Sequence, residues 1–270
     1  MDSKIEAPAQ VLRRIEEALE AAASAITPFV AGTHRVEYKS GNDPITEADR
    51  IANRILRDAL LQGGEGWLSE ESVDDLSRLG KERIWVVDPI DGTREFISGI
   101  PEWCVSVGYI ENGRAVAGGI CNPVTGEVFL GAQDEGVKLN GTSVCVSRCE
   151  SLEGAMVLAS RSEVARGEWD CCRDAPFVTR PMGSVAYKLA LVASGRADAT
   201  WTRSPKHEWD IAGGLALVEA AGGFVRNIDG FEIRFNNPSP VYSGLLACSP
   251  RLGPKLNSWL CEGAKHFDHS

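Results

Sequence analysis

Two carboxylates stand three residues apart, directly after an apolar β-branched run, in the segment IWVVDPIDGTREFI at residues 84–97. The first four residues of this segment predict a buried strand, which Pro89 and Gly92 are expected to end. A short helical segment is expected to begin around Gly92, where exposed amides would attract an anion, especially phosphate. Asp88 and Asp91 would repel that anion unless cations lay between them, so the arrangement favours a divalent metal site. On this segment alone, a turn cap at Asp88 and a helix start at Asp91 explain the two residues equally well.

The size and charge of the chain restrict the class of protein it can be. With 270 residues and 43% hydrophobic content it can form a large core, as one domain or as two packed halves. Its formal net charge of -10 and pI near 5.0 argue against a nucleic-acid or anionic-membrane surface. Residues 1–30 lack the apolar core of a signal peptide, and no apolar run is long enough to span a membrane. We therefore expect a cytoplasmic protein.

Other catalytic chemistries find little support in the sequence. The eight cysteines form no CxxC pair and the four histidines are scattered, so a zinc site is not expected. The cysteines are expected to be reduced, although Cys171 and Cys172 could be exposed thiols. No Walker or dinucleotide glycine loop is visible, and neither is a set of nucleophile, base and acid. Metal-assisted hydrolysis is the chemistry that remains.

Hydrophobic periodicity predicts two helices and a set of antiparallel strands in the first part of the chain. A core helix is expected over residues 8–27, and a second over 47–61 with Thr46 as its cap and Asp49 in its first turn. Alternating apolar segments separated by glycine turns predict an antiparallel meander over 105–132.

Beyond residue 150 the pattern changes to alternating short strands and helices. Strands are expected at 155–160, 197–201 and 245–249, and helices at 184–194 and 210–221. The sequence therefore predicts an α+β half at 1–150 and an α/β half at 151–270. No long flexible linker separates them, so the halves are expected to pack as one unit.

Two further acidic clusters lie where elements begin or end. SEES occupies residues 69–72 after an apolar pair, and EWD occupies residues 208–210 before a glycine- and alanine-rich helix. Element ends project side chains into a shared crevice, which is where a sheet-based enzyme places reactive groups. Alone, Glu70 is explained as a solvated loop acid and Asp210 as a helix cap. Together with the two aspartates of the first segment they favour one site.

Five segments share an order and spacing that go beyond these acids. They are KSGNDPITEAD (39–49), SEES (69–72), WVVDPIDGT (85–93), GSVAYKLALVASGRADA (183–199) and WDIAGGLALVEAAGG (209–223). The chain thereby resembles, over nearly its whole length, the inositol monophosphatase family of magnesium-dependent, lithium-sensitive phosphatases. The resemblance implies a mixed α/β (α+β) fold, a layered αβαβα sandwich with the active site between the two halves.

The resemblance also implies a set of metal ligands. Carried onto this sequence, one Mg2+ would be bound by Glu70, Asp88 and the backbone carbonyl of Ile90. A second would be bound by Asp88, Asp91 and Asp210, so that Asp88 bridges the pair, and a third, weaker ion near Glu70 occurs in relatives. Hard oxygen ligands suit Mg2+, and two such ions can stabilise the attacking and leaving oxygens of a phosphoryl displacement.

Catalytic roles follow from the same resemblance. The nucleophile would be water, deprotonated with help from Glu70 and from Thr93, whose hydroxyl would be held by Asp49. The amides of Gly92 and Thr93 would receive the phosphate, which Asp91 and Asp210 would also border.

Four further residues match family positions near the site: Lys39, Thr46, Gly183 and Ser184. Relatives place substrate contacts at the positions of Gly183 and Ser184, but a helix start explains these two residues equally well. Thr46 is equally well explained as a helix cap, and Lys39 as a solvated lysine.

The substrate is suggested by departures from the inositol pattern. DGTREF at 91–96 is closer to the DGTKEF of CysQ-like 3'(2'),5'-bisphosphate nucleotidases than to the DGTTNF of simple inositol monophosphatases. The chain has Thr202 and Arg203 where the inositol enzymes commonly offer a glutamate. Arg203 and Lys206 would neutralise the second phosphate of 3'-phosphoadenosine 5'-phosphate, unless they are ordinary surface charges.

Other functions stay open at this point. Inositol 1-phosphate or another sugar phosphate is the alternative substrate, and a non-catalytic phosphate-binding module is the alternative class. A small phosphorylated molecule is the expected partner, without nucleic acid or membrane, and the resemblance also allows a homodimer.

Overall fold

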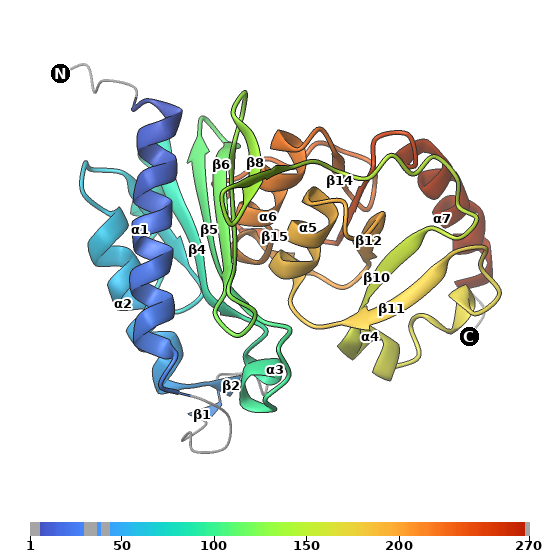
Figure 1. The fold of residues 1–270 in the computed structure, drawn as a ribbon, viewed down its shortest axis with the longest axis horizontal. Helices are drawn as coiled ribbons and strands as arrows, with labels where there is room; N and C mark the ends of the chain where they lie inside the picture. The colour runs from blue at the N-terminus through green and yellow to red at the C-terminus, as the bar shows by residue number, and fades with distance from the viewer. Residues whose placement is uncertain (1–5, 30–36, 39–43, 268–270) are drawn as a thin grey trace.

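A pair of helices forms the first layer of the molecule (Figure 1). The computed structural model describes residues 6–29, 37–38 and 44–267, so Lys39 lies outside the described residues. α1 spans Pro8–Ile26 and α2 spans Glu47–Leu60, which confirms both expected helices. Each turns an apolar stripe toward the sheet beside it. The buried residues of the stripes are Val11, Ile15, Ala18, Leu19, Ala22, Ile26, Ala48, Ala52, Leu56 and Leu60.

The second layer is a seven-stranded sheet in the strand order β3-β4-β5-β6-β7-β8-β9. The strands are β3 (Gly66–Ser69), β4 (Arg83–Asp91), β5 (Cys104–Glu111), β6 (Arg114–Asn122), β7 (Glu127–Ala132), β8 (Gly136–Leu139) and β9 (Thr142–Val144). Successive strands from β4 onward pair antiparallel, which confirms the predicted meander, while β3 pairs parallel to β4. Between β3 and β4 the chain forms a short 3-10 helix, η1 (Ser77–Gly80).

Strand β4 continues past the proline that was expected to end it. Asp88 pairs with Ser106, but Asp91 pairs with Cys104, so three steps along β4 match two along β5. Proline lacks an N–H to donate to the ladder, and the bulge here leaves one residue unpaired, as bulges do. In a regular strand, side chains three residues apart point to opposite faces; the extra residue brings Asp88 and Asp91 to the same face. The bulge is therefore what allows both carboxylates to border one cavity.

Two helices form the central layer, between the two sheets in Figure 1. They are α5 (Val185–Ala193) and α6 (Glu208–Ala220), and their limits agree with the expected helices to within two residues. Glycines let α6 lie directly on the first sheet, because a Cβ at Gly213 would stand 2.8 Å from the carbonyl oxygen of Val107. This close contact sets the position of the first turn of α6, which carries Asp210.

We expect Gly118→Ala to destabilise the fold by about 1–3 kcal/mol, because overpacking at a close contact forces the backbone apart. A Cβ at Gly118 would overlap the carbonyl oxygen of Gly213 and lie 3.0 Å from Ala216 Cβ. Gly80→Ala is the matched control, since no atom lies within 4 Å of a Cβ there. Urea unfolding of both variants tests this. Equal midpoints would show that the sheet and α6 can separate without cost.

The fourth layer is a five-stranded sheet in the order β11-β10-β12-β16-β14. Its strands are β10 (Met156–Ser160), β11 (Val178–Met182), β12 (Ala199–Thr202), β14 (Phe224–Asn227) and β16 (Leu245–Cys248). Two helices lie next to this sheet in Figure 1, α4 (Arg161–Ala165) and α7 (Gly253–Phe267). A 3-10 helix, η2 (Asp170–Cys172), follows α4 in the chain. Two small ribbons complete the fold, β1 (Glu37–Tyr38) with β2 (Pro44–Ile45), and β13 (Lys206–His207) with β15 (Val241–Tyr242). The order of layers is αβαβα, as the family resemblance implies.

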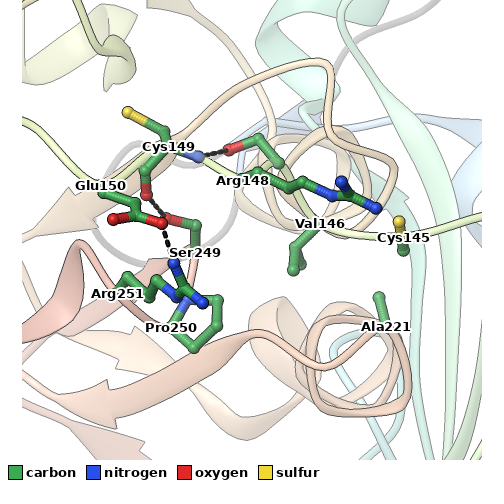
Figure 2. Close-up of a pocket in the computed structure, with 10 residues that line it drawn as sticks. Cys145, Val146, Arg148, Cys149, Glu150, Ala221, Ser249, Pro250 and Arg251 are labelled. Carbon is green, nitrogen blue, oxygen red and sulfur yellow. Dashed lines mark hydrogen bonds and ion pairs between the residues drawn. The ribbon is translucent and has the colours of Figure 1, made fainter.

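A cavity of about 540 Å³ lies where the chain passes from the first sheet to the second (Figure 2). Glu150 and Arg251 form an ion pair at its edge, and the hydroxyl of Ser249 donates to the carbonyl of Cys149. The thiols of Cys145 and Cys149 lie at opposite ends of the view and do not face each other. All the cysteines with described side chains are free, as expected. Within the described residues, no helix is long and apolar enough to cross a membrane.

Candidate active site

A second cavity, of about 570 Å³, collects most of the residues singled out in the sequence. It lies where the end of β4 meets the start of α3 (Thr93–Ile97), the start of α5 and the start of α6. The expected site residues that line it are Glu70, Asp88, Ile90, Asp91, Gly92, Thr93, Gly183, Ser184, Lys206 and Asp210. Segments up to 140 residues apart in the chain thus meet around one hollow, from the first half and the second.

The carboxylates of the cavity repel one another. Burial raises the pKa of Asp88 well above its usual value, and the neighbouring charges of Glu70 and Asp91 raise it further. Burial, followed by Asp91 and Glu70, raises the pKa of Asp210 to about 8. Carboxylates ionise together in such a place only when cations are present. Because the donors are hard oxygens, the set fits Mg2+ better than a softer metal.

These acids surround the cavity without being gathered around one point. Among the described residues, no three acidic, histidine or cysteine side chains are already arranged as a metal-binding group. The carbonyl of Ile90 accepts a hydrogen bond from the Thr93 hydroxyl at 3.1 Å, and the amide of Ile90 donates to Asp88 Oδ1 at 3.1 Å. The chemistry of the donors therefore supports a cation site more directly than their spacing does.

Asp91 is fixed by the start of α5. Its Oδ2 accepts hydrogen bonds from the Ser184 hydroxyl at 2.7 Å and from the Ala186 amide at 2.5 Å. These bonds, with the charge of Lys188, oppose the rise that burial causes in the pKa of Asp91. Ser184 has a φ of 54°, which is uncommon for a residue with a side chain. Its hydroxyl also accepts a hydrogen bond from the Tyr187 amide at 3.0 Å, and these side-chain bonds offset the backbone strain.

Gly183 and Ser184 thus line the cavity and also have structural tasks. The amide of Gly183 donates to Glu102 Oε2 at 2.9 Å, and a Cβ on this glycine would overlap Glu95. Gly92 has a similar requirement, since its φ is 98° and a Cβ there would stand 3.1 Å from the carbonyl oxygen of Glu102. The two glycines are needed for this shape whatever they bind.

Asp49 lies behind the cavity and reaches it through Thr93. It is buried, and its Oδ2 accepts from the amide of Thr46 at 2.7 Å and from the Thr46 hydroxyl at 2.6 Å. Its Oδ1 accepts from the Thr93 hydroxyl at 3.4 Å. Thr46 therefore caps α2 and also fixes Asp49, so the two explanations considered for it are compatible.

Several cavity residues were not identified from the sequence. Lys188 is 3% exposed and lines the cavity, and burial lowers its pKa to about 8. Arg161 also lines the cavity and forms ion pairs with Glu102 and Glu95. The sequence signal for Lys188 was a single charge within the apolar run VAYKLALVA, which a snorkelling lysine also explains.

Three further lining residues were not expected from the sequence: Arg166, His207 and Trp209. The rings of His207 and Trp209 stack with centroids 4.3 Å apart and planes 5° apart. Neither residue carried a pattern of its own in the sequence, because the stack forms only when β13 leads into α6.

The position of Arg203 differs from the expectation. Its guanidinium donates to the carbonyl of Leu260, near α7, at 3.0 Å, and the residue does not line the cavity. Lys206, only three residues later, does line it. The difference arises because β12 ends at Thr202 and the chain turns before β13, so that the two cations face different ways.

Comparison with known proteins decides the family. The model of the inositol monophosphatase family matches residues 7–263. The chain belongs to this family. Its members are metal-dependent phosphomonoesterases, typically with Mg2+, that act on small phosphorylated substrates, so this protein is a phosphatase.

Individual relatives of this inositol monophosphatase family member differ in the substrates they are named for. The inositol-1-monophosphatase of Rhizobium meliloti is 32% identical over 79% of this chain and 81% of its own. The fructose-1,6-bisphosphatase/inositol-1-monophosphatase of Thermotoga maritima is 33% identical over 77% and 81%. The crystal structure of CysQ from Bacteroides thetaiotaomicron matches with a TM-score of 0.75 and 25% identity, over 89% of this chain and 97% of that one.

Proposed function

We propose that this phosphatase removes the 3'-phosphate of 3'-phosphoadenosine 5'-phosphate to give AMP and inorganic phosphate. The observation that carries the proposal is the charge distribution around the cavity. Besides its acids, the cavity is lined by five cationic residues: Arg94, Arg161, Arg166, Lys188 and Lys206. A monophosphate needs one anion site, and a bisphosphate needs two, so these cations suit a second phosphate.

The acidic residues of the cavity would bind two Mg2+ ions. Glu70, Asp88 and the Ile90 carbonyl would bind the first, and Asp88, Asp91 and Asp210 the second, with a third ion near Glu70 as a further option. When bound, these ions would neutralise the carboxylates and polarise the phosphoryl group under attack.

The chain's own groups would then manage the proton and the anion. Thr93 and Glu70 would help to remove the proton of the attacking water, and Asp49 would orient the Thr93 hydroxyl through their 3.4 Å contact. The amides of Gly92 and Thr93 would bind the equatorial oxygens of the phosphoryl group. Water forms the new P–O bond, the bond to the ribose 3'-oxygen breaks, and that oxygen leaves with a proton.

The cationic residues of the cavity would bind the 5'-phosphate. Lys188 is the most telling residue, because its ammonium has three donors and makes a hydrogen bond of 3.4 Å to the carbonyl of Met182. A buried ammonium at a cavity wall is stabilised by an anion. The stacked rings of His207 and Trp209 border the same space, and a flat aromatic surface of this kind suits a nucleobase.

The alternative is hydrolysis of an inositol or sugar monophosphate. Three relatives above 30% identity are named for inositol 1-phosphate, and one of these is also named for fructose 1,6-bisphosphate. In such a substrate the hydroxyl groups would contact Ser160, Ser162 and Ser204, which also line the cavity.

Phosphate release by the purified protein, with and without Mg2+, separates these functions. 3'-Phosphoadenosine 5'-phosphate, inositol 1-phosphate and 3'-AMP are compared over a concentration series. We expect the bisphosphate to have the highest kcat/KM, and 3'-AMP to fall below it because it lacks the second phosphate. A higher kcat/KM for inositol 1-phosphate would reject the nucleotidase proposal while leaving the phosphatase assignment intact.

A pair of neighbouring substitutions tests the second phosphate site. Lys206→Ala is expected to raise the KM for 3'-phosphoadenosine 5'-phosphate about tenfold, since a charge-assisted contact contributes about 1.5 kcal/mol. Arg203→Ala is the control, because its guanidinium points to Leu260 and not to the cavity. Steady-state kinetics with the bisphosphate and with 3'-AMP are compared. An equal effect of Lys206→Ala on both substrates would contradict a role for Lys206 at the second phosphate.

A further inference from the structure

We propose that Arg78 is a positioning residue that joins the segment carrying Glu70 to the helix carrying Asp210. Through this connection the metal ligands of the two halves would keep one arrangement. The inference rests on the proposed metal roles of Glu70 and Asp210. It is carried by a set of partly buried hydrogen bonds between these two segments.

The first link lies within the segment that follows Glu70. The Arg78 side chain is 1% exposed. Its Nε donates to both carboxylate oxygens of Asp74 at 3.1 Å, and its Nη2 donates to Asp74 Oδ2 at 2.8 Å. A planar guanidinium fixes a carboxylate in this two-pronged way, which an ammonium cannot do. Asp74, four residues after Glu70, is thereby fixed to one buried cation.

The second link crosses to the other half of the chain. Arg78 Nη1 donates to Asn236 Oδ1 at 2.9 Å, and Nη2 donates to the carbonyl of Asn237 at 2.9 Å. In return, Asn236 Nδ2 donates to the carbonyl of Arg78 at 3.1 Å. These residues are about 158 positions apart in the sequence, so the contact is purely tertiary.

The third link reaches the helix with Asp210. Glu208, the first residue of α6, is fully buried, and its carboxylate accepts from the amides of Asn236 at 2.8 Å and Asn237 at 3.0 Å. Asn237 Nδ2 also donates to Glu208 at 2.7 Å. Asp210 follows in the same helical turn. A path of hydrogen bonds therefore runs from the Glu70 segment to the Asp210 helix without passing through the cavity.

Apolar side chains do not anchor the Glu70 segment, since Val73 is 98% exposed and Leu76 is 47% exposed. Asn53 of α2 does bind the turn, through Ser69 Oγ at 2.8 Å and the Glu71 carbonyl at 3.3 Å. That contact ties the turn to the first half only. Arg78 is the residue of this segment for which hydrogen bonds to the second half are established.

A buried polar network of this kind is weak evidence for stability, because desolvation offsets much of its attraction. Its effect on geometry is firmer, since each bond has a preferred direction and distance. Groups that hydrogen-bond directly to metal ligands typically change metal affinity by about 10- to 100-fold when they are removed. The Arg78 connection acts through the backbone next to the ligands, so the lower part of that range is expected.

Asn236→Gly tests the proposal with little disturbance. Asn236 has a φ of 68°, so glycine accepts its backbone conformation while the side-chain bonds to Arg78 are lost. Asn140→Gly is the matched control: Asn140 has a φ of 47°, and its side chain also makes two backbone hydrogen bonds, to Gly126 and Val128, within the meander. The Mg2+ dissociation constant of each chelator-treated protein is measured by calorimetry, followed by kcat and KM.

We expect Asn236→Gly to weaken Mg2+ binding by about tenfold or more, and Asn140→Gly to leave it within about twofold, although both lower the melting temperature. Mg2+ binding by Asn236→Gly within twofold of the parent would overturn the proposal and leave a structural role alone. Asp210→Asn in the same assay distinguishes a wrong ligand assignment from a wrong role for Arg78. Unchanged Mg2+ binding by Asp210→Asn would show that the ligand assignment, and not the Arg78 connection, is at fault.

Discussion

Replacing Asp91 with asparagine is expected to lower kcat by roughly a thousandfold, which corresponds to about 4 kcal/mol of transition-state stabilisation. The amide keeps the size of the carboxylate and can still accept a hydrogen bond from Ser184 or from the Ala186 amide. It loses the negative charge that the proposed second Mg2+ requires. The fold should therefore survive while turnover is nearly lost.

Phosphate release in saturating Mg2+ checks this result, with circular dichroism and a melting curve to establish that the variant is folded. Asp229→Asn serves as the control, because Asp229 is exposed and bonds only to Ser243 among the contacts established for it. If Asp91→Asn turned over as fast as the parent, the proposed metal ligands would be wrong.

Replacing Asp210 with asparagine is expected to have opposite effects on activity and on stability. The pKa of Asp210 is raised to about 8 in the folded protein, whereas an unfolded aspartate titrates near ~3.9. The unfolded state therefore loses its proton first, so this group lowers the free energy of unfolding progressively as the pH rises from about 4 to about 8. Asparagine does not ionise, and the penalty disappears. Turnover should fall as for Asp91→Asn.

Melting curves in chelator at pH 5 and pH 8 test whether ionisation of Asp210 destabilises the folded protein as expected. The variant should melt higher than the parent at pH 8, by about 5 °C for a gain of about 2 kcal/mol, and the difference should shrink at pH 5. Adding Mg2+ should raise the melting temperature of the parent more than that of the variant. A variant that melts lower than the parent at pH 8 in chelator would show that Asp210 stabilises the fold without metal.

Local patterns predicted the elements whose side chains alternate or repeat clearly. The helices at 8–27 and 47–61 were confirmed because their apolar stripes match the helical period, and the meander because glycine turns separate its strands. Strand β11 was missed, since its sequence VTRPM has three of five residues exposed and offers no alternation. β4 was expected to end too early, because a bulge next to a neighbouring strand tolerates a proline that local rules read as a stop.

The candidate site shows the same division between local and tertiary information. The acids could be located because each stands within a family segment. Lys188 could not, because it looks like one charge in an apolar helix until the tertiary fold brings it to the cavity. Arg203 and Lys206 are two cations of one short segment, and the sequence offers no reason to prefer either. The turn between β12 and β13 places Lys206 at the cavity and Arg203 away from it.

The dispersal of the site along the chain has a consequence for how the protein is made. During synthesis, the bulged strand with Asp88 and Asp91 emerges long before Ser184 and Asp210, which complete its surroundings. A nascent chain that stops short of α6 holds only part of the charge and few of the contacts that would retain a cation. If the proposed ligands are right, Mg2+ would bind the early chain only weakly and would stabilise the last docking step, when the C-terminal layers pack against the first sheet. The ion proposed to serve the reaction would then bind tightly only after the whole chain has been synthesised and has folded.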